Sequence, residues 1–307
     1  MDINTCLATT ESYRTLAYFS HVVPAAAIFV LALFTAVRMK FQYKSAIFFT
    51  FALSFSAWLL LDLTNWLTND YFVLAATWAP LDFANIVFFL LLALFVRVDL
   101  FKKPLNGWLI STFLLIAAVP FVITAAGYSV FELYQPHCEM LGNDFLALYK
   151  FIIEMLAIVY VVGLGLLHVI REASSIKERI RTFLVSGSIF LFMGTFSFAE
   201  YYSTQTGIYE ATMYSLFVLP LFILILTILI TSFDTFKLGS WGTKVLFYIF
   251  LIFSGTQFFF ANDVTDFLLA AMSFIVVLTL GVMLYQVSEK LQIVNTSQEA
   301  LMHFIGH

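Results

Sequence analysis

The sequence predicts an all-α integral membrane protein with about nine transmembrane helices. Its N-terminus would lie outside the cell and its C-terminus in the cytoplasm, and its last span would continue into a parallel coiled-coil helix. Composition is the first reason: of 307 residues, 62% are hydrophobic and 11% charged, whereas soluble domains are about 45–50% apolar and about 25% charged. The other two reasons are a series of long apolar runs and an alternation of charge between them.

Nine apolar runs approach the length of about 20 residues that a helix needs to cross the hydrocarbon core. They lie at 15–37, 45–67, 79–97, 108–127, 146–170, 183–201, 211–232, 244–260 and 267–285. The eighth run is short, so a full crossing and a re-entrant segment are both open alternatives.

Basic residues gather in every second connection between these runs. If those connections are cytoplasmic, 13 of the 15 Lys and Arg residues lie inside, and only Arg14 and Lys150 lie outside. Because basic residues are retained in the cytoplasm, the sequence predicts a multi-pass protein of a bacterial-type inner membrane. It divides into an extracytoplasmic tail (1–14), a membrane domain (15–285) and a cytoplasmic helix (286–307). A net charge of −4 offers no basic face for nucleic acid.

Cysteines and histidines suggest little cofactor chemistry. Cys6 and Cys138 would both face the oxidising side, so they form either one disulfide or two free thiols. His137 lacks the spacing of a zinc motif. His21 and His168 differ in depth by roughly 20 Å at 1.5 Å rise per residue, too far apart to hold one haem. We therefore expect no metal and no cofactor in this chain.

Polar residues inside the runs are the candidate ligand-binding site, because charge in the hydrocarbon region is costly and marks function by default. All of them are expected near the outer face: Asp62, Asn65, Asp82, Asn85, Lys150, Glu154 and Glu200. Lys150 lies one turn from Glu154 as an i,i+4 partner. The alternatives are helix ends that pair and face water, an outward pocket for a small polar or cationic ligand or an ion, and a proton or ion path. The inner half shows no polar continuation, which counts against a transporter.

The segment after the ninth run carries a heptad pattern from membrane to cytoplasm, with a gap at Gln298 before the register resumes at Leu301. Its apolar positions are Val277, Leu280, Leu284, Val287, Leu291, Val294, Leu301 and Ile305. Intervals of three and four predict a parallel helical pair, and hence a homodimer coupled to the last span. The alternative is one amphipathic helix lying on the bilayer, for which Lys290 is the only basic residue available.

The final residues, "EALMHFIGH", resemble the start of the phosphoacceptor box of sensor histidine kinases. Leu301 matches the large apolar position, Gly306 the small residue and His307 the phosphoacceptor. The membrane part looks like the input region of kinases in the seven-transmembrane sensor class, although nine runs are counted. The resemblance implies a chain cut at its box, with ATP, Mg²⁺ and response-regulator binding in a kinase core that follows, so that this chain alone would be inactive.

The sequence thus predicts the membrane sensor and signal-transmission region of a two-component sensor histidine kinase. Its partners would be membrane lipid, a second copy of the chain, a response regulator through the kinase core, and a small ligand or ion at the outer face. The alternative is a polytopic small-molecule transporter whose C-terminal helix dimerises.

Overall fold

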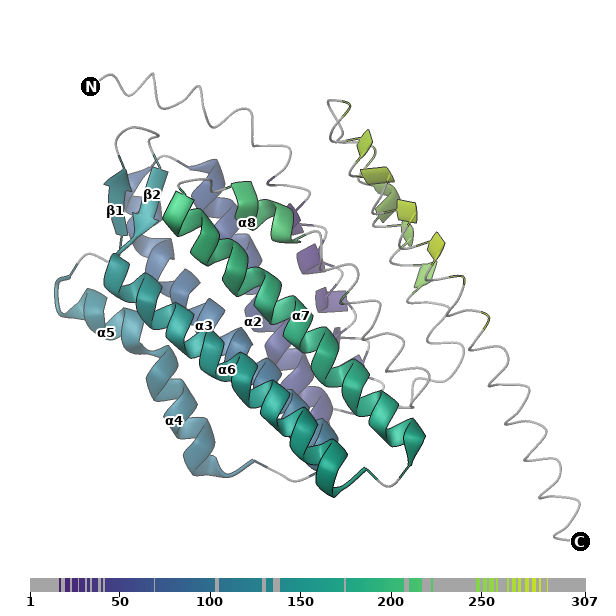
Figure 1. Cartoon of the computed structure of the whole chain (residues 1–307). Helices are drawn as coiled ribbons and strands as arrows, with labels where there is room; N and C mark the ends of the chain where they lie inside the picture. Colours follow the sequence, from purple (N-terminus) through teal and green to yellow (C-terminus); the bar gives the residue numbers. More distant parts are fainter. Residues whose placement is uncertain are drawn as a thin grey trace, which may run out of the picture.

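The structure, a computed structural model, is a bundle of long helices with one small β-hairpin (Figure 1). It describes most of 42–216, with gaps at 69, 103–104, 129–130, 135–138, 174 and 207–209, together with parts of 17–40 and scattered positions from 222 to 286. The elements are α2 (Tyr43–Leu67), α3 (Tyr71–Phe101), α4 (Gly107–Ala117), α5 (Val119–Ala125), β1 (Phe131–Tyr134), β2 (Glu139–Gly142), α6 (Asp144–Arg171), α7 (Ile176–Thr206) and α8 (Glu210–Ser215).

Within the described part, five helices are long and apolar enough to cross a membrane, or six if the bent pair α4–α5 forms one span. They are Ser20–Val37, Tyr43–Leu67, Phe72–Phe101, Asp144–Arg171 and Glu178–Ser203. These helices and the bent pair coincide with the first six predicted runs. The last three runs, the coiled-coil seam, Cys6, Cys138, His137 and His307 lie wholly or mostly outside the described residues.

Helix boundaries follow local capping chemistry. Three helices begin directly after Asp70, Asn106 and Asn143, whose side chains each accept a hydrogen bond from the backbone N–H two residues on. Such caps satisfy donors that the first helical turn leaves free. The cap at Asp70 starts α3 eight residues before the predicted run, and Pro80 lies inside the helix. The prediction therefore placed the start of this helix too late.

The fourth predicted span is not one straight helix. It is divided into α4 and α5, which meet at a bend of 43°. Pro120 stands in the first turn of α5. It has no N–H for the preceding turn, and its ring clashes with the carbonyl four residues earlier. The proline therefore breaks the run that hydropathy alone reads as continuous.

The connection between α5 and α6 contains the exception to the all-α prediction. Strands β1 and β2 pair antiparallel, with Phe131 opposite Gly142 and Tyr134 opposite Glu139. This hairpin lies at the same end of the bundle as α8 (Figure 1).

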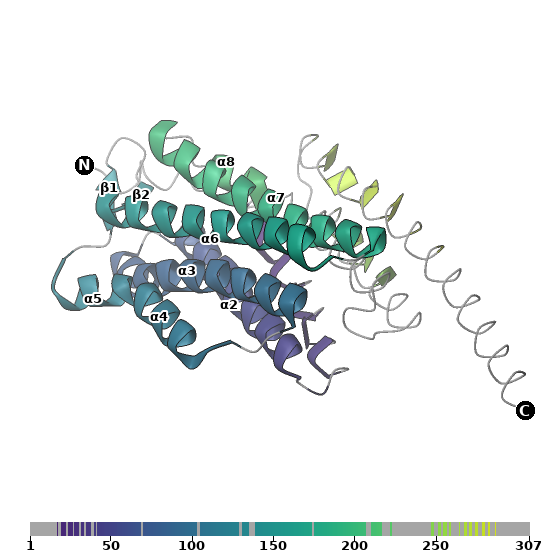
Figure 2. The ribbon, with the colours of Figure 1, turned by 60° about the horizontal axis from the view of Figure 1, so that its bottom comes forward.

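The bundle interior is aromatic. α2 packs on α3, α3 on α6 and α6 on α7, as Figure 2 shows from another side. The ring of Phe55 contacts Phe88 and Phe192 edge-on, with centroids 5.0 Å and 5.6 Å apart. Phe192 in turn stacks on Phe222 at 4.3 Å. Large interlocking rings of this kind tie α2, α3 and α7 together through packing that is favourable even in lipid.

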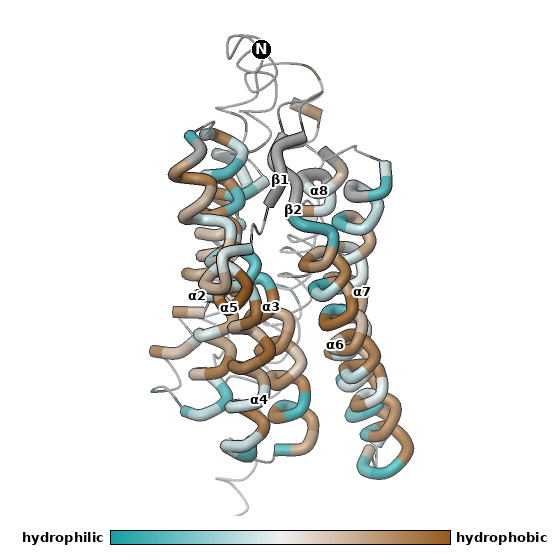
Figure 3. The backbone as a smooth tube through the Cα atoms, turned by 90° about the vertical axis from the view of Figure 1, so that its left-hand side faces the viewer, coloured by the Kyte–Doolittle hydropathy of each residue, from teal (hydrophilic) through white to brown (hydrophobic). Residues whose placement is uncertain are grey.

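The outward surface of α6 is apolar, and the two buried polar side chains of this helix lie on its inward surface. Residues at helical spacing along one side are exposed: Leu148, Ile152, Leu156, Val159, Leu166 and Ile170. Glu154 and His168 are buried on the other side. Hydrophobic residues cover the middle of α6 and α7 in Figure 3, and hydrophilic ones gather toward their ends. Exposed apolar area of this extent suits a lipid environment.

Gly165 allows α6 and α7 to approach closely. A Cβ added there would lie 2.4 Å from Ser186 Oγ and 2.8 Å from Ser186 Cβ, whereas one added at Gly163 would meet nothing within 4 Å. The missing side chain at Gly165 is therefore a packing feature of the contact between α6 and α7.

The Gly165→Ala variant should therefore lower the melting temperature of the purified protein in detergent, since overpacking costs about 1–3 kcal/mol. Gly163→Ala is the matched control on the same helix, and should be neutral or slightly stabilising because alanine favours helix. Adding Ser186→Gly to Gly165→Ala should restore much of the loss. Equal melting temperatures for the two glycine variants would contradict the close approach.

Candidate functional site

The structure brings five of the predicted polar residues together in one buried cluster, which we call the Lys150 network: Asp82 and Asn85 from α3, Lys150 and Glu154 from α6, and Glu200 from α7. Lys150 Nζ lies 2.9 Å from Asp82 Oδ1 and 2.6 Å from Glu200 Oε1. The lysine side chain is 13% exposed and that of Asp82 2%, whereas that of Glu200 is 36% exposed. Glu200 therefore forms the side of the network that solvent reaches.

Glu154 has a different partner from the one its spacing suggests. Asn85 Nδ2 donates to Glu154 Oε1 at 3.1 Å, and both side chains are buried. Lys150, one turn away on α6, instead bridges to α3 and α7. The predicted pairing of Lys150 with Glu154 is therefore replaced by contacts between helices.

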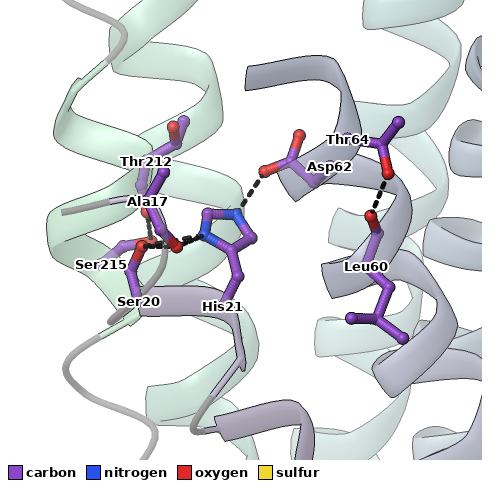
Figure 4. Close-up of polar contacts among 8 residues, drawn as sticks. All are labelled: Ala17, Ser20, His21, Leu60, Asp62, Thr64, Thr212 and Ser215. Atoms are coloured by element: carbon purple, nitrogen blue, oxygen red, sulfur yellow. Dashed lines mark hydrogen bonds and ion pairs between the residues drawn. The ribbon is translucent and has the colours of Figure 1, made fainter. Parts of the chain in front are cut away.

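The other two predicted residues lie apart from this network. His21 Nε2 lies 2.8 Å from Asp62 Oδ2, which joins the first helix to α2 (Figure 4). His21 Nδ1 lies 2.8 Å from both Ser20 Oγ and the Ala17 carbonyl. If Nε2–H donates to Asp62, Nδ1 either accepts from the Ser20 hydroxyl or, when protonated, donates to Ala17.

Asn65 makes a shorter-range contact. Its Oδ1 accepts from the Thr77 hydroxyl at 2.6 Å, which links the end of α2 to the start of α3. In both α2 and α3 an asparagine follows an aspartate three residues later, but the two pairs have different surroundings. Asp82 and Asn85 enter one network, whereas Asp62 and Asn65 face separate partners.

A second buried network, which the sequence analysis did not anticipate, lies at the other end of α3. Asp99 is buried and forms ion pairs with Lys44 of α2 and Arg181 of α7, the latter at 2.6 Å. We call these three residues the Asp99 network. The sequence predicts no polar continuation through the inner half, and it does not predict that Asp99 is buried in an ion-pair network near that end of α3. The predicted run ends at residue 97 and leaves Asp99 in the following connection, but α3 continues to Phe101.

A third polar contact joins α6 to α7 near the same end. His168 Nδ1 lies 2.8 Å from the Thr182 hydroxyl, and both residues are buried. The ring of Phe101 meets that of His168 edge-on at 5.6 Å. His21 and His168 thus each have a partner from a neighbouring helix.

One buried stripe on α3 connects the two networks. Its members recur at intervals of three and four and are all buried: Asp82, Asn85, Phe89, Leu92, Val96 and Asp99. At 1.5 Å per residue, the two aspartates are about 25 Å apart along the axis. α7 runs the opposite way and offers Glu200 to one network and Arg181 to the other. α3 and α7 are therefore joined directly near one end by Asp99 and Arg181, and near the other end through Lys150 of α6.

Comparison of the chain with protein-family models, with curated proteins and with solved structures gave no match.

Removing the Lys150 ammonium should destabilise the fold, because it leaves the buried carboxylates of the network without their cation. Loss of one partner from a buried ion pair costs about 3–5 kcal/mol. We therefore expect Lys150→Met to lower the melting temperature in detergent strongly at neutral pH. Lys102→Met, which removes an exposed lysine at the end of α3, is the control and should change little.

Combining Lys150→Met with Glu200→Gln should recover part of that loss, because the double variant removes a carboxylate together with the cation. A double-mutant cycle on these two positions isolates their coupling. If the effects of the two substitutions simply add, Glu200 and Lys150 do not form an energetically coupled pair.

Proposed function

We propose that this chain is the membrane sensor and signal-transmission region of a two-component sensor histidine kinase. The observation that carries the structural part of this proposal is the pairing of α3 with α7 through a charge network near each end. A stimulus that changes one network changes the preferred packing of both helices. The other network then experiences that change about 25 Å away.

The energetic requirement for such coupling is modest. A difference of about 1–3 kcal/mol between two packings changes an output by about 5–150-fold. Rearranging one buried ion pair is of that size or larger. Helices whose cores interlock through large aromatic rings also move as units rather than deforming continuously, which favours a switch between discrete arrangements.

The kinase part of the proposal rests on the sequence. The heptad that includes Leu284, Val287 and Leu291 would carry movement of the last span into a dimeric helix. The box "EALMHFIGH" would then present His307 to a kinase core. A neutral imidazole exposed on such a helix is a suitable nucleophile for a phosphoryl group.

A cation-coupled transporter is the second candidate, because the Lys150 network contains three carboxyl groups and one lysine. Against it, Phe89, Leu92 and Val96 separate the two networks along the buried stripe of α3. This stretch contains no polar side chain to relay an ion. Uptake of labelled sodium by proteoliposomes, driven by an imposed gradient and lost in Asp82→Asn, would favour the transporter.

The kinase proposal is tested by joining residues 1–307 to the catalytic core of a known sensor kinase, so that His307 replaces its phosphoacceptor. In proteoliposomes with ATP, we expect phosphorylation that disappears in His307→Gln. Asp99→Asn, which leaves Lys44 and Arg181 without their carboxylate, should change the phosphorylation level several-fold. Asp70→Asn makes the same chemical change at the other end of α3, where asparagine still caps the helix; it is the control and should leave the level unchanged.

Register along the seam provides a separate test in the same fusion protein. One alanine inserted after Gln292 shifts the heptad and should alter the phosphorylation level, whereas seven inserted residues restore the register and should return it. A phosphorylation level that is the same with the one-residue insertion, with Asp99→Asn and in the unaltered fusion protein would contradict transmission through this helix. A stop codon directly after codon 307 in the gene would contradict the kinase assignment.

A further inference from the structure

Two buried oxygens of the Lys150 network lack a hydrogen-bond donor. Asp82 Oδ2 and Asn85 Oδ1 have no hydrogen-bond partner, and their residues are only 1% and 2% exposed. The Asn85 amide is oriented by Glu154, toward which it points its NH₂ group. An ionised carboxylate and an amide oxygen can only accept, so neither can satisfy the other. Leaving such groups unpaired costs about 1–3 kcal/mol each.

The network also contains more negative than positive groups. Lys150 is one cation facing the carboxyl groups of Asp82 and Glu200, and Glu154 lies one turn along α6. If Glu200 is left out of the count because solvent reaches it, Asp82 and Glu154 still provide two carboxyl groups for the single ammonium group of Lys150. Two like charges in a shared buried site cannot readily both be ionised.

A proton removes both defects. A protonated carboxyl group gains an O–H donor, which an acceptor such as Asn85 Oδ1 requires, and it lowers the surplus of negative charge. Ser197 on α7 is also buried and interacts with Glu154, and its hydroxyl oxygen can accept a hydrogen bond from a protonated carboxyl group. Among the residues that the structure describes, no three His, Cys, Asp or Glu side chains form a group that could hold a metal ion.

We propose that the Lys150 network is a proton-binding site, in which Asp82 and Glu154 share one proton exchanged with water past Glu200. The proton is assigned to the two carboxyl groups together, because Asn85 donates to Glu154 and lies one turn from Asp82 on the same buried face of α3. Its release leaves two ionised carboxylates beside one lysine and drives α3 and α6 to rearrange. This inference deepens the proposed function by naming its stimulus as proton concentration on the side of Glu200.

The direct test is infrared difference spectroscopy of the purified chain in detergent, between acidic and alkaline buffer. We expect the C=O stretch of a protonated carboxyl group at neutral pH, reduced in Asp82→Asn or Glu154→Gln and lost in the double variant. Asp70→Asn makes the same chemical change on the same helix and keeps the N-cap, because asparagine caps as well as aspartate. It should leave the band unchanged.

Thermal stability gives an independent readout. The folded chain holds a proton that the unfolded chain has lost at neutral pH, so its stability should fall as the pH rises. The slope approaches 2.303RT, about 1.36 kcal/mol per pH unit for one proton. The double variant should flatten this slope, and Asp70→Asn should retain it.

Two spectroscopic results would overturn the proposal: no carboxyl band at neutral pH in the wild-type chain, or an unchanged band in the double variant. A melting temperature that changes when choline replaces sodium at constant ionic strength, but does not change with pH, would also overturn it. Because these measurements use residues 1–307 without a kinase core, their failure is distinct from failure of the kinase assignment. A proton site without a kinase would leave the first proposal contradicted and this one standing.

Discussion

Burial of charge in an apolar helix bundle is the constraint on which this structure depends. Lys150 and Asp99 place charges in an interior formed largely of phenylalanine. The desolvation free energy of an unpaired ion there would be comparable with or larger than the net stability of a folded protein. Each is acceptable only because oppositely charged groups come from two other helices. The positions of α2, α3, α6 and α7 are therefore specified by ion pairs in addition to packing.

This requirement gives the ion pairs a specifying role. In lipid, apolar faces do not discriminate strongly between neighbours, because the tails are as apolar as the side chains. Two buried networks about 25 Å apart on the same helices restrict both the choice of neighbour and the vertical register of α3 against α7. Aromatic packing around Phe55 and Phe192 then fills the space between.

A bundle held together in this way is also sensitive to charge. Adding or removing one proton or one partner in a buried network changes the free energy by an amount comparable with the difference between two packings. The Lys150 network has the less complete set of partners, with two unpaired acceptors. The Asp99 network has a carboxylate held by two cations. The Lys150 network is therefore better suited to respond to a stimulus, and the Asp99 network is better suited to hold α2, α3 and α7 together.

The sequence by itself located the first six long apolar runs, because hydropathy depends only on composition along the chain. The early start of α3 and the break between α4 and α5 depend on a capping side chain and a proline. The sequence also identified the polar residues that would share a helix face, such as Asp82 with Asn85, since that follows from helical periodicity. Tertiary structure decided which of these faces meet. Lys150 prefers Asp82 and Glu200 over Glu154 one turn away, because partners across an interface depend on helix order and depth. Asp99 was missed for the same reason. Its basic neighbours in the sequence indicate a loop, whereas in the structure it lies on α3 and pairs with Lys44 and Arg181 from two other helices.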